Sequence, residues 1–203
     1  MSVRFRFDEQ KAIAAVVYLA SKPTVTDFDK GKAAKLLFLA DKFHLVRYAR
    51  PILGDEYRAL DNGPVPQCAL DLMHALIDPA NRGVWVNSEA LKTLSDLIEV
   101  DDHYHYPRLA SKGIVEPQVL SASEIEALDR VAMLHGNKSF GELRALTHEM
   151  PAYSKAWEAK PADARFAPMC YEDFFEEDSD ALAGAMEEML ENWEIQEALD
   201  RKR

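Results

Sequence analysis

The sequence predicts a mainly helical α+β protein, in which a single helical domain with a small antiparallel sheet is followed by an acidic C-terminal helix. Several segments repeat apolar residues every three to four positions, which is typical of amphipathic helices. Two shorter segments, Asp55–Leu60 and Glu99–Tyr106, alternate weakly between apolar and polar residues. This alternation favours strands, and we expect the two to pair with each other. The third observation is that most of the negative charge lies near the C-terminus.

Two helices are expected before the first strand. Asp8–Ser21 places its apolar residues on one stripe. The cap residues of Thr26–Asp29 open a second helix that runs to about Ala49, and Pro51 stops it. This second helix is apolar on several sides, as buried helices are, so we expect it to be the central element.

A proline-framed turn follows the first strand. Asp61–Pro64 predicts a turn, because Asn-Gly supports a positive φ and the next proline fixes the exit. Pro66 then suits the first turn of a third helix, Pro66–Ile77. Ser88–Ile98 has the apolar spacing of a fourth helix.

Capping signals define the helices of the C-terminal half. Ser121–His135 and Ser139–Glu149 each begin with a Ser-x-x-Glu capping box. Pro151–Glu158 predicts a further turn of helix, and Ser179–Leu199 predicts the last helix. No internal repeat is evident.

The net charge of −11 is unevenly distributed. Residues 172–203 hold 12 acidic and 3 basic residues, a net of −9, and the remaining residues have a net of −2. The near-neutral body argues against a nucleic-acid ligand. The tail would attract a basic partner, or would only keep the chain soluble. We divide the chain into a domain of residues 1–158, a connector of residues 159–178 and an acidic amphipathic helix of residues 179–203.

Other features indicate a cytoplasmic binding protein. The longest apolar runs fall short of the roughly 20 residues that a membrane span needs, and no secretory signal follows Met1–Phe7. Cys68 and Cys170 are too few for a disulfide scaffold and lack metal spacing. The sequence lacks a phosphate-binding glycine loop, a nucleophile elbow and a zinc-binding helix motif. We therefore expect neither an enzyme, nor a cofactor, nor a small-molecule substrate.

Two groups of polar residues could form a catalytic or metal-binding site. Asp41 and His44 lie three residues apart and share a helix face, where we expect a buried hydrogen bond that fixes the helix. On an extended strand, Asp101, His103 and His105 would point the same way. With His44 they could bind zinc in a metal-dependent enzyme, which is one alternative function. We favour a polar strip that contacts a partner, with no metal.

The block from residue 35 to residue 69 resembles a known family. Lys35–His44 reads KLLFLADKFH, Tyr48 follows, and then come Arg50–Asp55 (RPILGD), Tyr57–Leu60 (YRAL) and Gly63–Pro66 (GPVP). This ordered set is similar to the Panacea domain of the SocA-like antitoxin family. A looser resemblance covers most of residues 8–158. An additional segment within residues 79–95 and the acidic tail are not part of the family pattern.

The resemblance implies a function. Members of this family are antitoxins encoded beside a toxin, which they neutralise by direct binding. Because the toxins are of many unrelated kinds, the domain does not identify the toxin. One branch consists of proteolytic adaptors that present a toxin to the ClpXP protease, so an adaptor for a toxin or a host protein is an alternative here.

The motif residues are expected to build the fold, whereas contacts with a partner are expected from exposed positions. The last helix either docks on its own core or binds the partner with Met and Trp anchors. The motif residues expected to have structural roles are Lys35, Leu36, Leu37, Asp41, His44, Tyr48, Pro51, Gly54, Gly63, Pro64 and Pro66. The residues expected to contact the partner are Arg47, Asp55, Tyr57, Arg58, Asp101, His103, Tyr104, His105, Met186, Met189 and Trp193.

Overall fold

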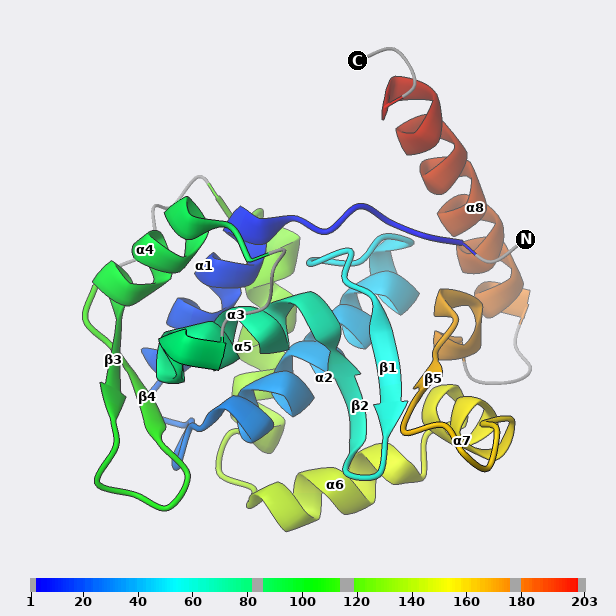
Figure 1. Ribbon diagram of the computed structural model, residues 1–203. Coiled ribbons are helices and arrows are strands. Elements are labelled where there is room, and N and C mark those ends of the chain that lie inside the picture. Colours follow the sequence, from blue (N-terminus) through cyan, green and yellow to red (C-terminus); the bar gives the residue numbers. More distant parts are fainter. Residues whose placement is uncertain (1–2, 82–85, 114–118, 176–179, 201–203) are drawn as a thin grey trace.

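The computed structural model describes residues 3–81, 86–113, 119–175 and 180–200, and these form a mainly helical structure with two small antiparallel sheets (Figure 1). The helices are α1 (Glu9–Ala20), α2 (Lys30–Tyr48), α3 (Gln67–Ile77), α4 (Ser88–Leu97), α5 (Ala122–His135), α6 (Phe140–His148), α7 (Pro151–Glu158) and α8 (Asp180–Asp200). The strands are β1 (Tyr57–Leu60), β2 (Gly63–Pro66), β3 (Ile98–Asp101), β4 (Arg108–Ser111) and β5 (Ala167–Pro168), and the 3-10 turns are η1 (Pro79–Asn81) and η2 (Tyr171–Phe174).

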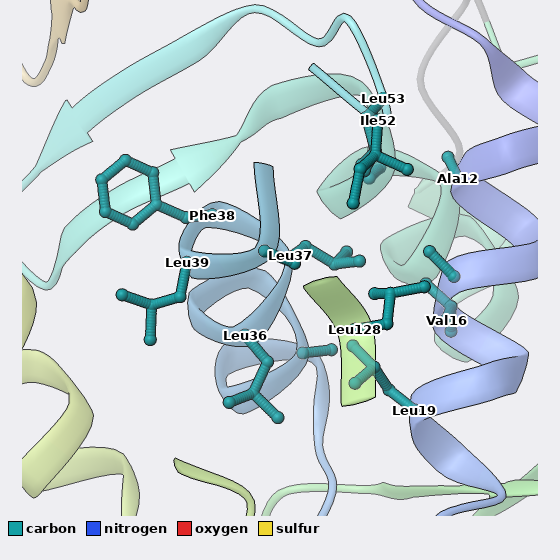
Figure 2. Close-up of a cluster of buried hydrophobic side chains, with 14 of the residues drawn as sticks. Ala12, Val16, Leu19, Leu36, Leu37, Phe38, Leu39, Ile52, Leu53 and Leu128 are labelled. Carbon is teal, nitrogen blue, oxygen red and sulfur yellow. The ribbon is translucent and has the colours of Figure 1, made fainter. Parts of the chain in front are cut away.

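Helix α2 is the central element, as its apolar pattern predicted. It packs against α1, α3, α5, α6 and α8, and both faces of its KLLFLAD segment are buried (Figure 2). Asp29 caps its start by accepting a hydrogen bond from the amide of Lys32. It ends at Tyr48, and its C-cap residue, Ala49, adopts the left-handed conformation with φ of 54°. Burying each large aliphatic side chain on this helix contributes about 1.5–3 kcal/mol, which makes α2 the largest single contributor to the core.

The sheet beside α2 differs from the predicted one. Its strand order is β2-β1-β5, with all pairs antiparallel. Leu60 pairs with Gly63, so the predicted turn contains only two connecting residues and the GPVP segment is itself a strand. Its prolines are tolerated because β2 is an edge strand and needs fewer amide donors.

The predicted pairing of Glu99–Tyr106 with β1 is wrong. Only Ile98–Asp101 is extended there, and this strand pairs with β4 in a separate two-stranded sheet. The register places Asp101 opposite Arg108, so residues 102–107 form the connecting loop. Alternation in sequence predicts a strand but not its partner, and here the partner is the next extended segment of the chain.

The helix boundaries in the C-terminal half follow the predicted capping signals. Both capping boxes are formed, with Ser121 and Glu124 at the start of α5 and Ser139 and Glu142 at the start of α6. Each pair satisfies two amide donors that the first helical turn leaves without partners.

The segment between α7 and α8 contributes to the core. Its strand β5 pairs with β1, and Tyr171 and Phe174 in η2 are buried. The ring of Phe174 meets those of Phe38 and Tyr57 edge-on, 5.3 Å from each. Aromatic edge contacts of this kind add about 0.5–1.5 kcal/mol each beyond area burial, so this segment fastens the sheet to α2.

The last helix, α8, lies against the body at its beginning and then extends away from it (Figure 1). In the described part of the chain, no helix is both long and apolar enough to cross a membrane.

Candidate partner-binding surfaces

The motif carboxylate Asp41 fixes the turn that follows α2. Its side chain is fully buried and accepts hydrogen bonds from the amides of Ile52 and Leu53 at 2.7 and 3.0 Å. The hydroxyl of Tyr57 donates to its other oxygen at 2.9 Å. Burial raises the pKa of Asp41 to about 7 despite these donors. One side chain thus ties the RPILGD turn and strand β1 to the central helix.

Asp55 fixes the start of α3 in a similar way. Its two oxygens accept from the amides of Cys68 and Ala69, each at 2.8 Å. These amides belong to the first turn of α3, whose N-cap residue, Pro66, provides no side-chain cap. The hydroxyl of Tyr171 donates to the backbone carbonyl of Asp55 at 2.7 Å. Burial raises the pKa of the Asp55 carboxyl to about 6.

Lys35 supports the β1–β2 hairpin from α2. Its ammonium is buried and donates to the carbonyl of Pro64 at 2.7 Å, and burial lowers its pKa to about 7. The backbone of Gly63, at φ of 97°, lies next to this ammonium group, and a Cβ there would lie only 2.9 Å from the lysine nitrogen. The glycine is required both by the turn and by the lysine.

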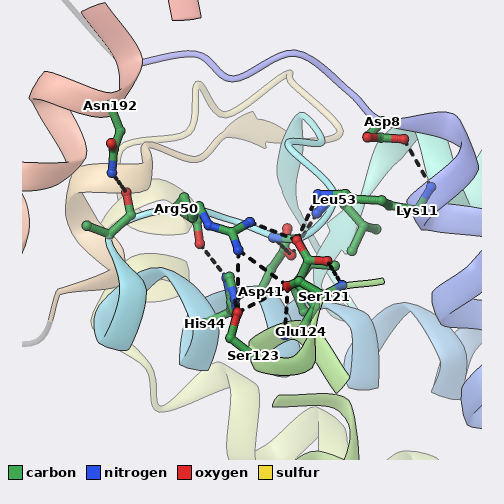
Figure 3. A network of polar contacts seen from close by, with 12 residues as sticks. Asp8, Lys11, Asp41, His44, Arg50, Leu53, Ser121, Ser123, Glu124 and Asn192 are labelled. Carbon is green, nitrogen blue, oxygen red and sulfur yellow. Dashed lines mark hydrogen bonds and ion pairs between the residues drawn. The ribbon is translucent and has the colours of Figure 1, made fainter. Parts of the chain in front are cut away.

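His44 and Glu124 connect α2 to α5 (Figure 3). The two nitrogens of His44 contact the carbonyl of Arg50 at 2.7 Å and the hydroxyl of Ser123 at 3.0 Å. Because a carbonyl only accepts, Nδ1 carries the proton and Nε2 accepts from the serine. Burial opposes the charge of Glu124, but its bonds to Lys11, the Ser121 amide and Arg50 lower its pKa to about 2.

The expected pairing of Asp41 with His44 takes a different form in the structure. Both side chains are buried and hydrogen-bonded, but each holds a different part of the chain. Their spacing on one helix face positions them for two separate contacts, with Ile52–Leu53 and with Arg50. The other motif residues expected to be structural are also buried, except Tyr48, which is partly exposed; these are Lys35, Leu36, Leu37, Pro51, Gly54, Gly63, Pro64 and Pro66.

Two residues expected to contact a partner lie inside the protein. Asp55 and Tyr57 are 1% and 3% exposed, and their polar atoms are engaged by α3 and by Asp41. We had expected them at the surface, but hydrogen bonds to the start of α3 and to Asp41 hold their side chains in the core. Arg58 is partly exposed and covers the ring of Phe166 at 4.4 Å, and Arg47 is exposed at the end of α2.

The β3–β4 hairpin ends in an exposed aromatic and polar loop. Tyr104 is 44% exposed and Tyr106 65%, and His105 contacts the ring of Tyr106. The guanidinium of Arg108 lies 3.7 Å from the ring centre of Tyr104, which holds that ring at the surface. Because residues 102–106 form a loop, the predicted strand face of Asp101, His103 and His105 does not exist.

The arrangement of histidines does not match the predicted zinc set. His103 bonds to Asp101 at 2.8 Å, which raises the pKa of the exposed imidazole and lowers that of the carboxylate. In the part of the chain that the structure describes, the possible metal ligands grouped here are Asp101, Asp102 and His103. His44 does not join them, because its ring nitrogens are bonded within the core.

Helix α8 has a docked side and an exposed side. Met189 is fully buried, Met186 and Trp193 are half-buried against the core, and the amide of Asn192 donates to the carbonyl of Ala49 at 3.2 Å. The three residues expected to anchor a partner therefore hold α8 to its own domain. Among the side chains of this helix whose burial is described, the large exposed apolar ones are those of Leu190, Ile195 and Leu199.

One surface feature was not predicted. Phe43 and Val46 of α2, with Leu134 of α5 and Met150, line a groove of about 470 Å³, and Arg130 lies beside it. Phe43 belongs to α2, the helix that we expected to be buried, but its side chain is only partly buried. Helix α5 packs on α2 but leaves this strip uncovered, and no local sequence signal shows where this cover ends.

The fold and its exposed surfaces define a mainly helical domain with an internally bonded motif and two projecting elements, the β3–β4 hairpin and α8. Residues 34–154, more than half of the chain, match the family described as Antitoxin SocA-like, Panacea domain. The chain therefore belongs to this family. Searches of curated proteins and of solved structures found no significant match.

Proposed function

We propose that this protein is the cytoplasmic antitoxin of a toxin–antitoxin system and neutralises a toxin encoded by the adjacent gene through direct binding. The observation that carries the proposal is the family match over residues 34–154. The mechanism that we favour is occlusion, in which the bound antitoxin covers the active or target-binding surface of the toxin.

The exposed residues among the expected contacts give two candidate contact regions for the toxin. Tyr104, His103 and His105 lie on the projecting β3–β4 loop, and Arg47 lies exposed at the end of α2. Tyrosine and arginine are frequent anchors in protein interfaces. The buried motif then builds the domain that carries these projections, which is consistent with one domain serving many toxins.

Coexpression tests the function. The product of the adjacent gene should stop growth when expressed alone, and this chain should restore growth and copurify with it. We expect Tyr104→Ala combined with Tyr106→Ala to weaken the complex, and the matched control Met133→Ala, which changes a 69% exposed residue on α5, to leave it intact. A harmless neighbour, or a toxic one that does not copurify, would contradict the proposal.

The same experiment separates occlusion from delivery to a protease. Occlusion predicts that the amount of toxin, measured by immunoblot, stays constant while growth recovers. A fall in toxin that requires ClpXP would identify the protein as an adaptor instead and would overturn the occlusion mechanism.

A further inference from the structure

One side of α8 combines exposed acidic and apolar residues, next to Asn192, whose amide bonds to the body. Glu188, Glu191, Ile195 and Leu199 are spaced by three, four and four residues, so they form one stripe along the helix. All four are exposed, and Ile195 and Leu199 each expose 59% of their surface. The buried Met189 lies on a different side of the helix. Two large aliphatic residues at i and i+4 on an outward face are a typical pair of anchors for a groove.

The groove between α2 and α5 has the complementary chemistry. Its floor is apolar, formed by Phe43, Val46, Leu134 and Met150, and Leu134 is 47% exposed. Arg130 lies on its edge, with the guanidinium 4.8 Å from the centre of the Phe43 ring. In the described part of the chain Arg130 makes no ion pair with a carboxylate, so its charge faces the groove without compensation.

A second cation, Arg47, also lines this groove. Its side chain is 56% exposed, and Glu126 lies 3.7 Å away, which compensates part of its charge. Arg130 therefore has more to gain from an incoming carboxylate than Arg47 has, and Lys42, which also lines the groove, adds to its positive charge. An acidic helix with two aliphatic anchors fits this combination of an apolar floor and a basic edge.

We propose that this protein self-associates, with the outer stripe of α8 of one copy docked in the groove between α2 and α5 of a second copy. Ile195 and Leu199 occupy the apolar floor, and Glu191 approaches Arg130. Each copy carries both the helix and the groove, so reciprocal docking forms a closed dimer. With two aliphatic anchors per groove, the dissociation constant is on the order of micromolar.

Sedimentation velocity of the full chain alone tests the proposal, so its outcome is independent of the antitoxin function. At moderate salt, where ions screen the repulsion between two chains of net charge −11, we expect a concentration-dependent shift from monomer to dimer. A chain that remains monomeric at every concentration would overturn the proposal.

Two sets of variants locate the contact. Ile195→Ser combined with Leu199→Ser should weaken the dimer by at least about tenfold. Leu190→Ser is the matched control, because it removes an exposed leucine on the same helix outside the stripe. Arg130→Glu and Glu191→Arg should each weaken the dimer, and the double variant should recover it because the two charges meet again across the interface. Unchanged melting temperatures would confirm folding, and a dimer that tolerates the stripe variant or Arg130→Glu would overturn the proposal.

Discussion

Buried polar side chains in this protein connect consecutive segments of the chain, because they hydrogen-bond to the backbone amides of the segment that follows. Asp41 satisfies two amides of the turn after α2, and Asp55 satisfies two amides at the start of α3. A buried amide without a partner costs about 1–3 kcal/mol, so each carboxylate prevents the loss that two such amides would cause.

Asp41→Asn should change how stability depends on pH. The pKa of this carboxyl is about 7 in the folded chain, whereas an unperturbed aspartic acid has a pKa of 3.8. Between these values the folded chain keeps a proton that the unfolded chain has lost. The contribution of this group to the free energy of unfolding therefore falls as the pH rises from about 4 to about 7.

Urea unfolding on both sides of this pH interval provides the measurement. Asparagine keeps an oxygen that accepts from Ile52 and Leu53, and it cannot titrate. We expect the wild type to lose more stability than the variant as the pH rises. The exposed substitution Asp163→Asn serves as the control. Parallel curves for the wild type and Asp41→Asn would show that Asp41 keeps its ordinary pKa.

Gly54→Ala should destabilise the protein strongly. Gly54 has φ of 63°, and a Cβ there would lie 2.3 Å from the carbonyl oxygen of Arg6. Because that atom belongs to the backbone, the N-terminal segment would have to shift, and we expect a loss of at least about 2 kcal/mol. Gly141→Ala, in helix α6 with an open position for Cβ, should be neutral or stabilising by up to about 1 kcal/mol. Thermal unfolding compares the two, and equal melting temperatures would refute the argument.

At the scale of elements, local signals predicted the helices, whereas the strands depended on distant contacts. Caps and apolar spacing lie within a few residues of each other, so α5 and α6 begin where their capping boxes indicate. The partner of a strand is chosen by packing in three dimensions. Strand β5 is two residues long and pairs with β1 from more than a hundred residues away, which no local pattern reveals.

The same reasoning explains the outcome for the candidate contact residues. Tyr104 and His103 were expected at a surface because the segment is polar, and they are exposed even though their strand ends earlier than predicted. Tyr57 was expected on the surface, but its ring is buried and its hydroxyl donates a hydrogen bond to the buried Asp41. Residue type predicted exposure correctly in the projecting β3–β4 loop. It failed for Tyr57, whose neighbouring segments pack against α2.

Helix α8 should respond differently to substitutions on its two sides. Met189→Ala removes a fully buried side chain, and methionine-to-alanine changes in cores cost about 2–5 kcal/mol. The neighbouring substitution Leu190→Ala changes a residue that is 38% exposed and should cost less than about 1 kcal/mol. Limited proteolysis and thermal unfolding should therefore show a loosened α8 only for Met189→Ala. Equal sensitivity would mean that α8 is not docked in solution.

In the molecule as a whole, most of the negative charge lies in the C-terminal segment, outside the nearly neutral body. Residues 172–203 carry a net charge of −9 out of −11, and α8 holds many of these carboxylates on a helix that extends past the domain. Fields of this kind act over distances of about a Debye length, roughly 8–10 Å at physiological salt. They raise the rate at which a basic partner is encountered more than they strengthen the final complex.

Neutralising this helix should therefore slow association with the proposed toxin. Replacing Glu187, Glu188, Glu191 and Glu194 with glutamine removes four charges while keeping good helix formers. At low salt we expect the association rate constant to fall by about tenfold or more and the dissociation rate constant to change little. The difference should disappear at high salt, where screening already suppresses the field. Stopped-flow binding would measure both constants, and an unchanged association rate at low salt would show that the charge of this helix does not steer the partner.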